Sequence, residues 1–193
     1  MPRSTYFCID IECGGPVPAL YDMMSLGAVV VHEVDETHVI GARFYVEIEP
    51  SAPRVDPGAM AIHGLTLEHL RAHGQPLGQA LDQLSAFVAE HTEAGSTPTF
   101  VGHNAPFDWS FVHYAYHACG RPNPFGYKAL DTKALATGTL GLHWLDSNKE
   151  TLEHLLDLPP QDEQQVHRAD YDAEYQALIL VRLLERRAPC AAS

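Results

Sequence analysis

The sequence predicts an α/β protein in which helices flank a mixed five-stranded sheet. Three observations lead to this prediction. Strand-like segments come first in the chain, helix-like and strand-like segments alternate after them, and 46% of the residues are hydrophobic. A chain of 193 residues with no low-complexity segment and no linker is long enough to bury one core. We therefore expect residues 1–193 to form a single domain.

The first three predicted strands form an antiparallel meander. Residues 5–13 alternate between an apolar face and a face that carries both Asp10 and Glu12, which is the period of a strand. Two further β-rich runs follow at 24–31 and 39–48, and a short polar turn separates them. Short connections of this kind favour antiparallel neighbours.

After residue 50 the pattern becomes that of helices with short strands between them. The clearest helix follows Pro76, because apolar residues recur there at helical spacing, at Leu77, Leu81, Leu84 and Val88. A helix near Pro106 should bury the face formed by Phe107, Phe111, Tyr114 and Ala118. The remaining expected segments are helices at 57–63, 151–158 and about 169–187, and strands at 99–102 and 129–132.

The composition restricts both partners and location. A net charge of −13, from 12 Lys and Arg against 25 Asp and Glu, disfavours a protein that grips long duplex electrostatically, although carboxylates suit hard divalent metals. No apolar run approaches the ~20 residues that span a bilayer, and the N-terminus does not resemble a signal peptide. The four cysteines show no CxxC pair, so we expect reduced thiols, a cytoplasmic location and no membrane association.

The pair formed by Asp10 and Glu12 is the first candidate for a chemical site. Side chains two residues apart on a strand point the same way, about 7 Å apart, so both carboxylates could hold one cation. The spacing alone is not diagnostic, because Asp172 and Glu174 repeat it. An edge strand with one face in solvent would show the same pattern.

The segment from His103 to Asp108 is the second candidate, because it joins a predicted buried strand to a predicted helix. Asp108 would stand in the first turn of that helix, where a carboxylate also compensates the helix dipole. Asn104 occupies a position typical of a capping side chain. Both residues therefore have a structural explanation as well as a functional one.

The third candidate, His167 with Asp172, opens the last predicted helix. Five residues on a helix correspond to a rotation of 140°, so the two side chains could not share a helical face. We expect His167 to lie in the preceding loop and to lean over a site to which Asp172 contributes. Asp170 and Asp172 would also suit a helix N-terminus for electrostatic reasons alone.

In this order and with these flanks, the three segments resemble the DEDDh 3′–5′ exonuclease superfamily, which includes ribonuclease T and the proofreading subunits of bacterial replicative polymerases. The matching motifs are DxE at Asp10 and Glu12, Asn-x-x-x-Asp at Asn104 and Asp108, and His-x(4)-Asp at His167 and Asp172. The resemblance covers about residues 5–187 and implies a ribonuclease-H-like fold.

Two shorter segments add to the resemblance and one residue departs from it. The run from Ile62 to Thr66, which includes His63, looks like the Ile-His-Gly-x-Thr signature of proofreading subunits, and Asp131 with the next residue falls where such proteins have Asp-Thr. Members of the superfamily usually follow DxE with Thr or Ser, whereas this chain has Cys13. The preference between RNA and DNA is therefore left open.

The resemblance also implies roles for individual residues. Two Mg²⁺ or Mn²⁺ ions would be held by four carboxylates, those of Asp10, Glu12, Asp108 and Asp172. His167 would act as the general base on water. Substrate binding would fall to His63, Asn104 and Phe107, the aromatic rings by stacking on terminal bases.

The function expected from the sequence is thus metal-dependent removal of nucleoside monophosphates from the 3′ end of single-stranded nucleic acid. The alternative is a proofreading-type subunit that mainly docks on a polymerase, which we rank lower because few residues follow the last predicted helix. The resemblance further implies that the chain could form a homodimer.

Overall fold

The computed structural model describes residues 3–35, 37–51 and 54–186. Five strands form one sheet: β1 (Arg3–Cys13), β2 (Met23–Val34), β3 (Thr37–Glu47), β4 (Ser96–Gly102) and β5 (Ala129–Asp131). Their order is β3-β2-β1-β4-β5. The first three strands pair antiparallel, whereas β1, β4 and β5 run parallel to one another. The mixed sheet and the antiparallel meander are confirmed.

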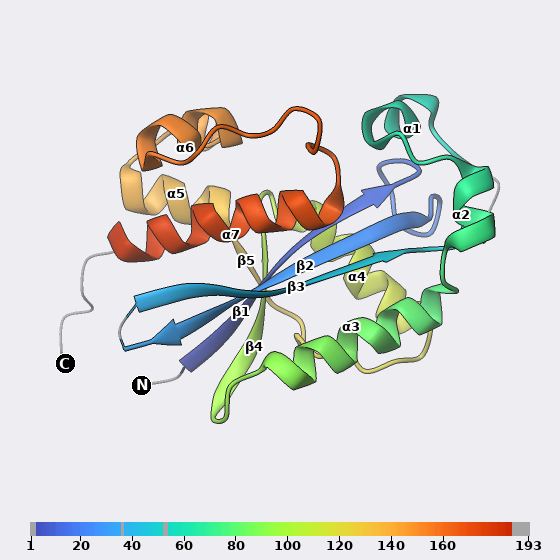
Figure 1. Cartoon of the computed structure of the whole chain (residues 1–193), viewed down its shortest axis with the longest axis horizontal. Coiled ribbons are helices and arrows are strands. Elements are labelled where there is room, and N and C mark those ends of the chain that lie inside the picture. The colour runs from blue at the N-terminus through green and yellow to red at the C-terminus, as the bar shows by residue number, and fades with distance from the viewer. Residues whose placement is uncertain (1–2, 36, 52–53, 187–193) are drawn as a thin grey trace.

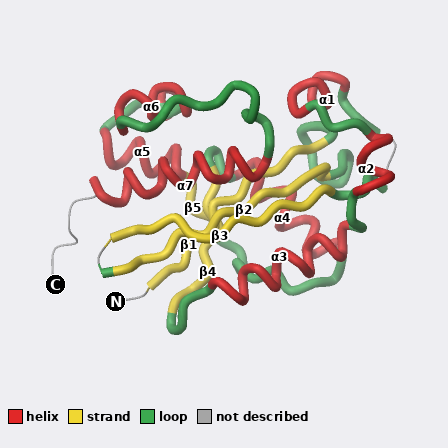
Figure 2. Tube along the Cα trace, viewed as in Figure 1, coloured by secondary structure: helices red, strands yellow, loops and turns green. Residues whose placement is uncertain are grey.

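Helices cover both faces of this sheet (Figures 1 and 2). Within the described residues these are α1 (Pro57–His63), α2 (Leu67–His73), α3 (Leu77–His91), α4 (Pro106–Ala118), α5 (Thr132–Leu140), α6 (Lys149–Leu156) and α7 (Ala169–Arg186), with a 3-10 turn, η1 (Trp144–Asp146). Helix α7 lies along one face with α5 and α6 beyond it, and α3 and α4 cover the other face. Helix α1 stands near the carboxyl end of β1.

The central strand β1 is buried on both sides. Phe7, Ile9 and Ile11 belong to the core cluster that includes residues of α3 and α4. On the opposite side Cys8 packs in a second cluster with residues of α7, among them Ala177. The alternative of an edge strand with a solvated face is therefore wrong, and the carboxylates of β1 point into a covered region of the protein.

One glycine sets how closely α7 approaches the sheet. Gly27 of β2 pairs with Asp10 of β1, and a Cβ built on Gly27 would lie 2.2 Å from the carbonyl carbon of Ala169. No side chain fits between the strand and the first turn of α7. The absence of a side chain at this position therefore brings that turn directly beside Asp10.

The helix after β4 buries Phe111 as predicted, but the other three residues of the predicted core face are not buried. Phe107, Tyr114 and Ala118 are exposed, whereas a stripe displaced by one residue is buried: Asp108, Phe111, Val112, Ala115 and Tyr116. The physical reason is that the helix is rotated to turn the Asp108 carboxylate inward. The expected capping role of Asn104 is also wrong, because the N-cap is Ala105 and no side chain caps the helix there.

Other differences concern elements without a strong apolar stripe. Helices α2 and α5 were not predicted from the sequence. Helix α2 buries only Leu70, and helix α5 buries only Thr132 and Ala136. In contrast, the helix with the clear stripe, α3, buries Leu81, Leu84 and Val88 as expected.

The expectations about cysteines and membranes can be checked within the described residues. Cys8, Cys13 and Cys119 are free thiols, and Cys190 lies outside the described part of the chain. Cys8 and Cys13 belong to clusters on opposite faces of the sheet, as the strand period requires. None of the helices in the described ranges is long and apolar enough to cross a bilayer.

Candidate active site

The carboxyl end of β1 carries two inward-pointing carboxylates. Asp10 is half-buried and Glu12 is buried, and the two side chains share one face of the strand. Gln176 of α7, itself buried, donates from Nε2 to Asp10 Oδ1 at 2.7 Å. The strand and α7 are thus joined directly at the first of the two acids.

Asp108 reaches the same place from α4. Strand β4 pairs with β1 only as far as Cys8, after which the chain turns into α4. The backbone N–H of Ile11 then donates to Asp108 Oδ1 at 3.1 Å, where no strand pairs with it on that side. The third carboxylate is therefore fixed to the backbone between the first two.

The fourth carboxylate and a histidine come from the start of α7. His167 stands in the loop before the helix with φ 67°, in the left-handed region, and its side chain is exposed. The backbone N–H of His167 donates to Asp172 Oδ2 at 2.7 Å, which ties the loop to the first turn of the helix. Ligand atoms of Glu12, His167 and Asp172 lie within 4.8 Å of one another. The expectation that His167 lies in the loop over the site is confirmed.

Asp170, which also opens α7, has a different environment. Its carboxylate accepts from Arg168 Nε at 2.8 Å and from Arg168 Nη2 at 2.7 Å. Those hydrogen bonds lower the pKa of Asp170 against the effect of its burial. Asp170 therefore belongs to a separate ion pair and not to the carboxylate cluster.

The crowding of acids changes their ionisation. Burial, followed by the charge of Asp172, raises the pKa of Glu12 to about 8. Burial also raises the pKa of Asp108 to about 7, against the opposing effect of the Ile11 hydrogen bond. The pKa of Asp10 is raised well above its usual range by burial and then by Asp108. Buried carboxylates this close need positive charge to ionise together at neutral pH.

These donors fit divalent metal ions. Hard cations such as Mg²⁺ and Mn²⁺ take carboxylate oxygens as ligands, and four carboxylates converge on one cavity of about 200 Å³. In the metal-free protein, burial and then the charges of neighbouring acids raise the pKa values of Asp10, Glu12 and Asp108. Asp10, Glu12, Asp108 and Asp172 therefore offer oxygen ligands of the kind that such cations take.

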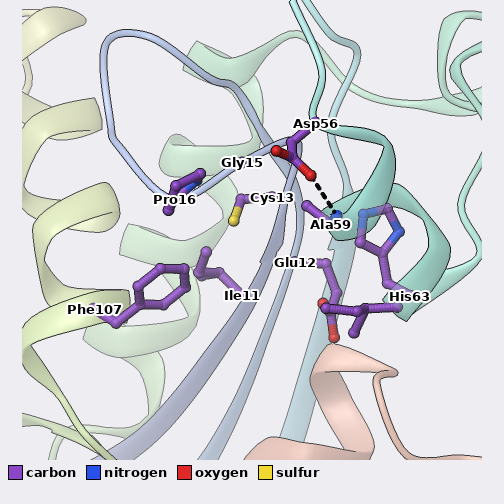
Figure 3. Close-up of a pocket in the computed structure, with 10 residues that line it drawn as sticks. Ile11, Glu12, Cys13, Gly15, Pro16, Asp56, Ala59, His63 and Phe107 are labelled. Carbon is purple, nitrogen blue, oxygen red and sulfur yellow. Dashed lines mark hydrogen bonds between the residues drawn. The ribbon is translucent and has the colours of Figure 1, made fainter.

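A second cavity of about 390 Å³ opens beside the first (Figure 3). Glu12, Ile11 and Phe107 line both cavities, so the two are neighbours. Figure 3 shows Phe107 on one side of the second cavity and His63 on the other, with the Cys13 thiol between them. Most of its surface is apolar, unlike the carboxylate cavity.

The wall that α1 contributes to the second cavity is positioned by its capping residue. Asp56 accepts from the backbone N–H of Gly58 at 2.8 Å and of Ala59 at 3.1 Å, and its own N–H donates to the Gly14 carbonyl at 2.6 Å. This links the helix to the loop after β1. At the other end of α1, His63 Nδ1 accepts from the Leu65 N–H at 3.0 Å, which places the ring proton of the neutral tautomer on Nε2.

All eight residues selected from the sequence line one or both of these cavities. Asp10, Asp108, His167, Asp172 and Asn104 line the carboxylate cavity, His63 lines the apolar one, and Glu12 and Phe107 line both. Asn104 has φ 64°, and the backbone N–H groups of Asn104 and Ala105 donate to Asp131 Oδ1 at 2.9 and 3.3 Å. Asp131 thus holds the turn that leads into α4.

Three site residues were missed from the sequence. Lys149 at the start of α6 lines the carboxylate cavity and its Nζ donates to Asp172 Oδ1. His103 lines the same cavity, and Gln176 lies one helical turn after Asp172. The available signal was a Gln at i+4 from a candidate ligand, whereas Lys149 lay outside the helix predicted at 151–158.

Comparison with known proteins matches this chain to 3′–5′ exonucleases and its fold to that of a DEDDh family member. The sequence model of the 3′-5′ exoribonuclease Rv2179c-like domain matches residues 5–184, and the chain belongs to that family. The chain is therefore a 3′–5′ exonuclease.

Among individual relatives, the 3′-5′ DNA exonuclease Cap18 of Escherichia coli is 33% identical over 184 residues, which cover 95% of this chain and 93% of Cap18. The nuclease domain of 3′hExo, a DEDDh family member bound to rAMP, has a TM-score of 0.77 at 13% identity, covering 95% of this chain and 92% of that one. The E. coli ExoI–ssDNA complex has a TM-score of 0.70 at 20% identity, and the match covers 97% of this chain but 41% of ExoI. The expected ribonuclease-H-like fold is thereby confirmed.

Proposed function

We propose that this exonuclease removes nucleoside monophosphates from the 3′ end of single-stranded nucleic acid by metal-assisted hydrolysis. The observation that carries the proposal is the convergence of four carboxylates on one cavity with an exposed histidine beside them. Asp10, Glu12, Asp108 and Asp172 would hold two Mg²⁺ or Mn²⁺ ions. Such ions, when bound, polarise the phosphodiester and favour a nucleophilic water at neutral pH.

In this proposal His167 is the general base. Its ring is exposed, and one of its nitrogens lies within 4.8 Å of carboxylate oxygens of Glu12 and Asp172, so it can take a proton from a water at the edge of the cluster. Histidine is the side chain that most often serves as a general base. Asp172 accepts the backbone N–H of His167 and so fixes the loop that carries the ring.

The apolar cavity is proposed to hold the terminal nucleoside. Its volume of about 390 Å³ lies within the range of small-ligand sites, roughly 300–1,000 Å³. Phe107 and His63 offer ring faces from opposite walls, and Asn104 lies at the neighbouring phosphate site. Because the cavity adjoins the carboxylates at Glu12, a nucleoside there would present its 5′ phosphodiester to them.

The nature of the strand is a further part of the proposal. The family is described as exoribonuclease, whereas Cap18 is described as a DNA exonuclease, so we propose activity on both RNA and DNA. The net charge of −13 leaves little cationic surface for a long backbone, which favours short contacts with the last few nucleotides.

We also propose that residues 1–193 act as one exonuclease domain in the cytoplasm, which the free thiols of Cys8 and Cys13 support.

The test is digestion of 5′-labelled RNA and DNA oligonucleotides of equal sequence with Mg²⁺, with Mn²⁺ and with chelator. We expect a descending ladder with either metal, no digestion with chelator, and no digestion when the 3′ end carries a phosphate. Asp10→Asn should abolish the ladder. Cleavage of a circular single strand would contradict the proposal, because a circle has no end to seat in the apolar cavity.

A further inference from the structure

Among the described residues that line the carboxylate cavity, Lys149 is the only lysine or arginine. Its side chain is 22% exposed, and its ammonium forms an ion pair with Asp172, whose side chain is 4% exposed. Asp10, Asp108 and Asp172 all raise the pKa of Lys149, against the larger single effect of burial, which alone would lower it. The ion pair with Asp172 places the ammonium group of Lys149 at the wall of the carboxylate cavity.

Local structure does not explain a lysine at this position. Lys149 is the first residue of α6, near the positive end of the helix dipole, where a cation is unfavourable. The helix is already capped by Asn148, whose side chain accepts from the Thr151 N–H at 2.8 Å, and Glu150 supplies the favourable first-turn charge. Burial of an ammonium adds a desolvation cost. The position is costly for the helix, so its explanation lies in the cavity.

Neither His103 nor Lys133 supplies a positive charge to the carboxylate cavity. Burial, then Lys149 and Lys133, lower the pKa of His103 to about 3, so that ring is neutral. Lys133 lies with its Nζ 4.3 Å from the centroid of the Trp144 ring and does not line the cavity. Within the described lining, Lys149 is the fixed positive charge that stands beside the carboxylates.

The net charge of the site with two divalent ions bound suggests what Lys149 does there. Two divalent ions would cancel the four carboxylates, so Lys149 would leave the loaded site with one positive charge. A phosphodiester carries one negative charge and gains a second in the transition state of hydrolysis. A preorganised cation aimed at such developing charge stabilises the transition state.

We propose that Lys149 is a further catalytic residue, whose ammonium leaves Asp172 and donates to a non-bridging oxygen of the scissile phosphate. This inference rests on the proposed function. Lys149 forms no covalent bond in this role, since it donates hydrogen bonds only. In the metal-free protein the same ammonium partly neutralises Asp172, as the structure shows.

The experiment compares Lys149→Met, which removes the charge but keeps much of the length, with Lys149→Arg and with the control Lys133→Met. Calorimetry first measures Mn²⁺ alone, and then dAMP and deoxyadenosine in the presence of Mn²⁺. We expect Lys149→Met to weaken dAMP binding by about 10- to 100-fold, the usual loss for a charge-assisted hydrogen bond. Its affinity for deoxyadenosine and Mn²⁺ should not fall, Lys149→Arg should keep part of the dAMP affinity, and Lys133→Met should change nothing.

The pattern of losses decides between roles. An equal loss for dAMP and deoxyadenosine would show that Lys149 shapes the nucleoside cavity, and a loss of Mn²⁺ affinity would show that it only positions Asp172. Unchanged dAMP binding would show a counter-ion without contact to phosphate. Each of these results overturns the inference, and Lys149→Gln replaces Lys149→Met if circular dichroism shows that the latter is unfolded. If the wild-type protein neither digests oligonucleotides nor binds dAMP, the proposed function itself fails, and the inference fails with it.

Discussion

In the absence of divalent metal, the free energy of unfolding of this protein should fall as the pH rises. In the absence of metal, the pKa of Glu12 is about 8, against an ordinary value of 4.5, mainly because the side chain is buried. A carboxyl group whose pKa is raised by folding binds its proton more tightly in the folded chain. Stability is therefore present at low pH and is lost as the pH rises towards the raised pKa.

The magnitude follows from the width of the pH interval. Between pH 5.5 and 8, Glu12 is protonated in the folded chain and ionised in the unfolded one, and each pH unit is worth about 1.4 kcal/mol. This single group thus accounts for a loss on the order of 3 kcal/mol. For a domain of this size that corresponds to a fall in Tm of about 6–12 °C. Asp108, with its pKa raised to about 7, should act in the same direction.

The assay is thermal unfolding in excess chelator across this pH range, with and without saturating Mn²⁺. Mn²⁺ should raise Tm more at pH 8 than at pH 5.5, since ionised carboxylates bind it. Glu12→Gln is the matched control and should flatten the pH dependence of the chelated protein. A Tm that does not change with pH in chelator, or an identical slope in Glu12→Gln, would refute the reasoning.

Three further predictions concern single side chains. His167→Ala should lower the hydrolysis rate by roughly 10²–10⁴ at neutral pH while calorimetry shows Mn²⁺ binding retained, and lost Mn²⁺ binding would identify His167 as a ligand instead. Phe107→Ala should raise the KM for a single-stranded oligonucleotide by about 5- to 100-fold with kcat nearly unchanged, from the loss of base stacking, and an unchanged KM would exclude that role. Gly27→Ala should lower the free energy of unfolding in urea by about 1–3 kcal/mol, because a Cβ there overlaps the first turn of α7. The control Gly138→Ala, whose Cβ meets nothing within 4 Å, should be neutral or stabilising, and equal stability of both variants would contradict the packing argument.

Features carried by local periodicity could be predicted from the sequence. The alternation around Asp10 and Glu12 identified β1 and its carboxylate face, and the loop position of His167 followed from the angle between residues on a helix. The apolar stripe of α3 identified that helix. Each of these signals extends over a few neighbouring residues, which is why no knowledge of tertiary packing was required.

Features that depend on contacts between distant segments could not be predicted in this way. The buried face of α4 was assigned one residue away from its true position, because the inward turn of Asp108 towards the Ile11 N–H is a tertiary contact. Lys149 lies 23 residues from Asp172 in the chain, and no spacing rule connects them. Helix α5 buries too few residues to produce a stripe.

The dispersal of the site along the chain has a consequence for biosynthesis. Asp10 bonds to a residue 166 positions later, and Ile11 to one 97 positions later, so the set of four carboxylates is complete only after α7 has packed on the sheet. Contacts of such long range form late, since the intervening chain must first be ordered. A polypeptide still emerging from a ribosome holds its first two acids long before Asp172 exists. The active site of this nuclease therefore becomes complete only once the last helix of the fold has been made.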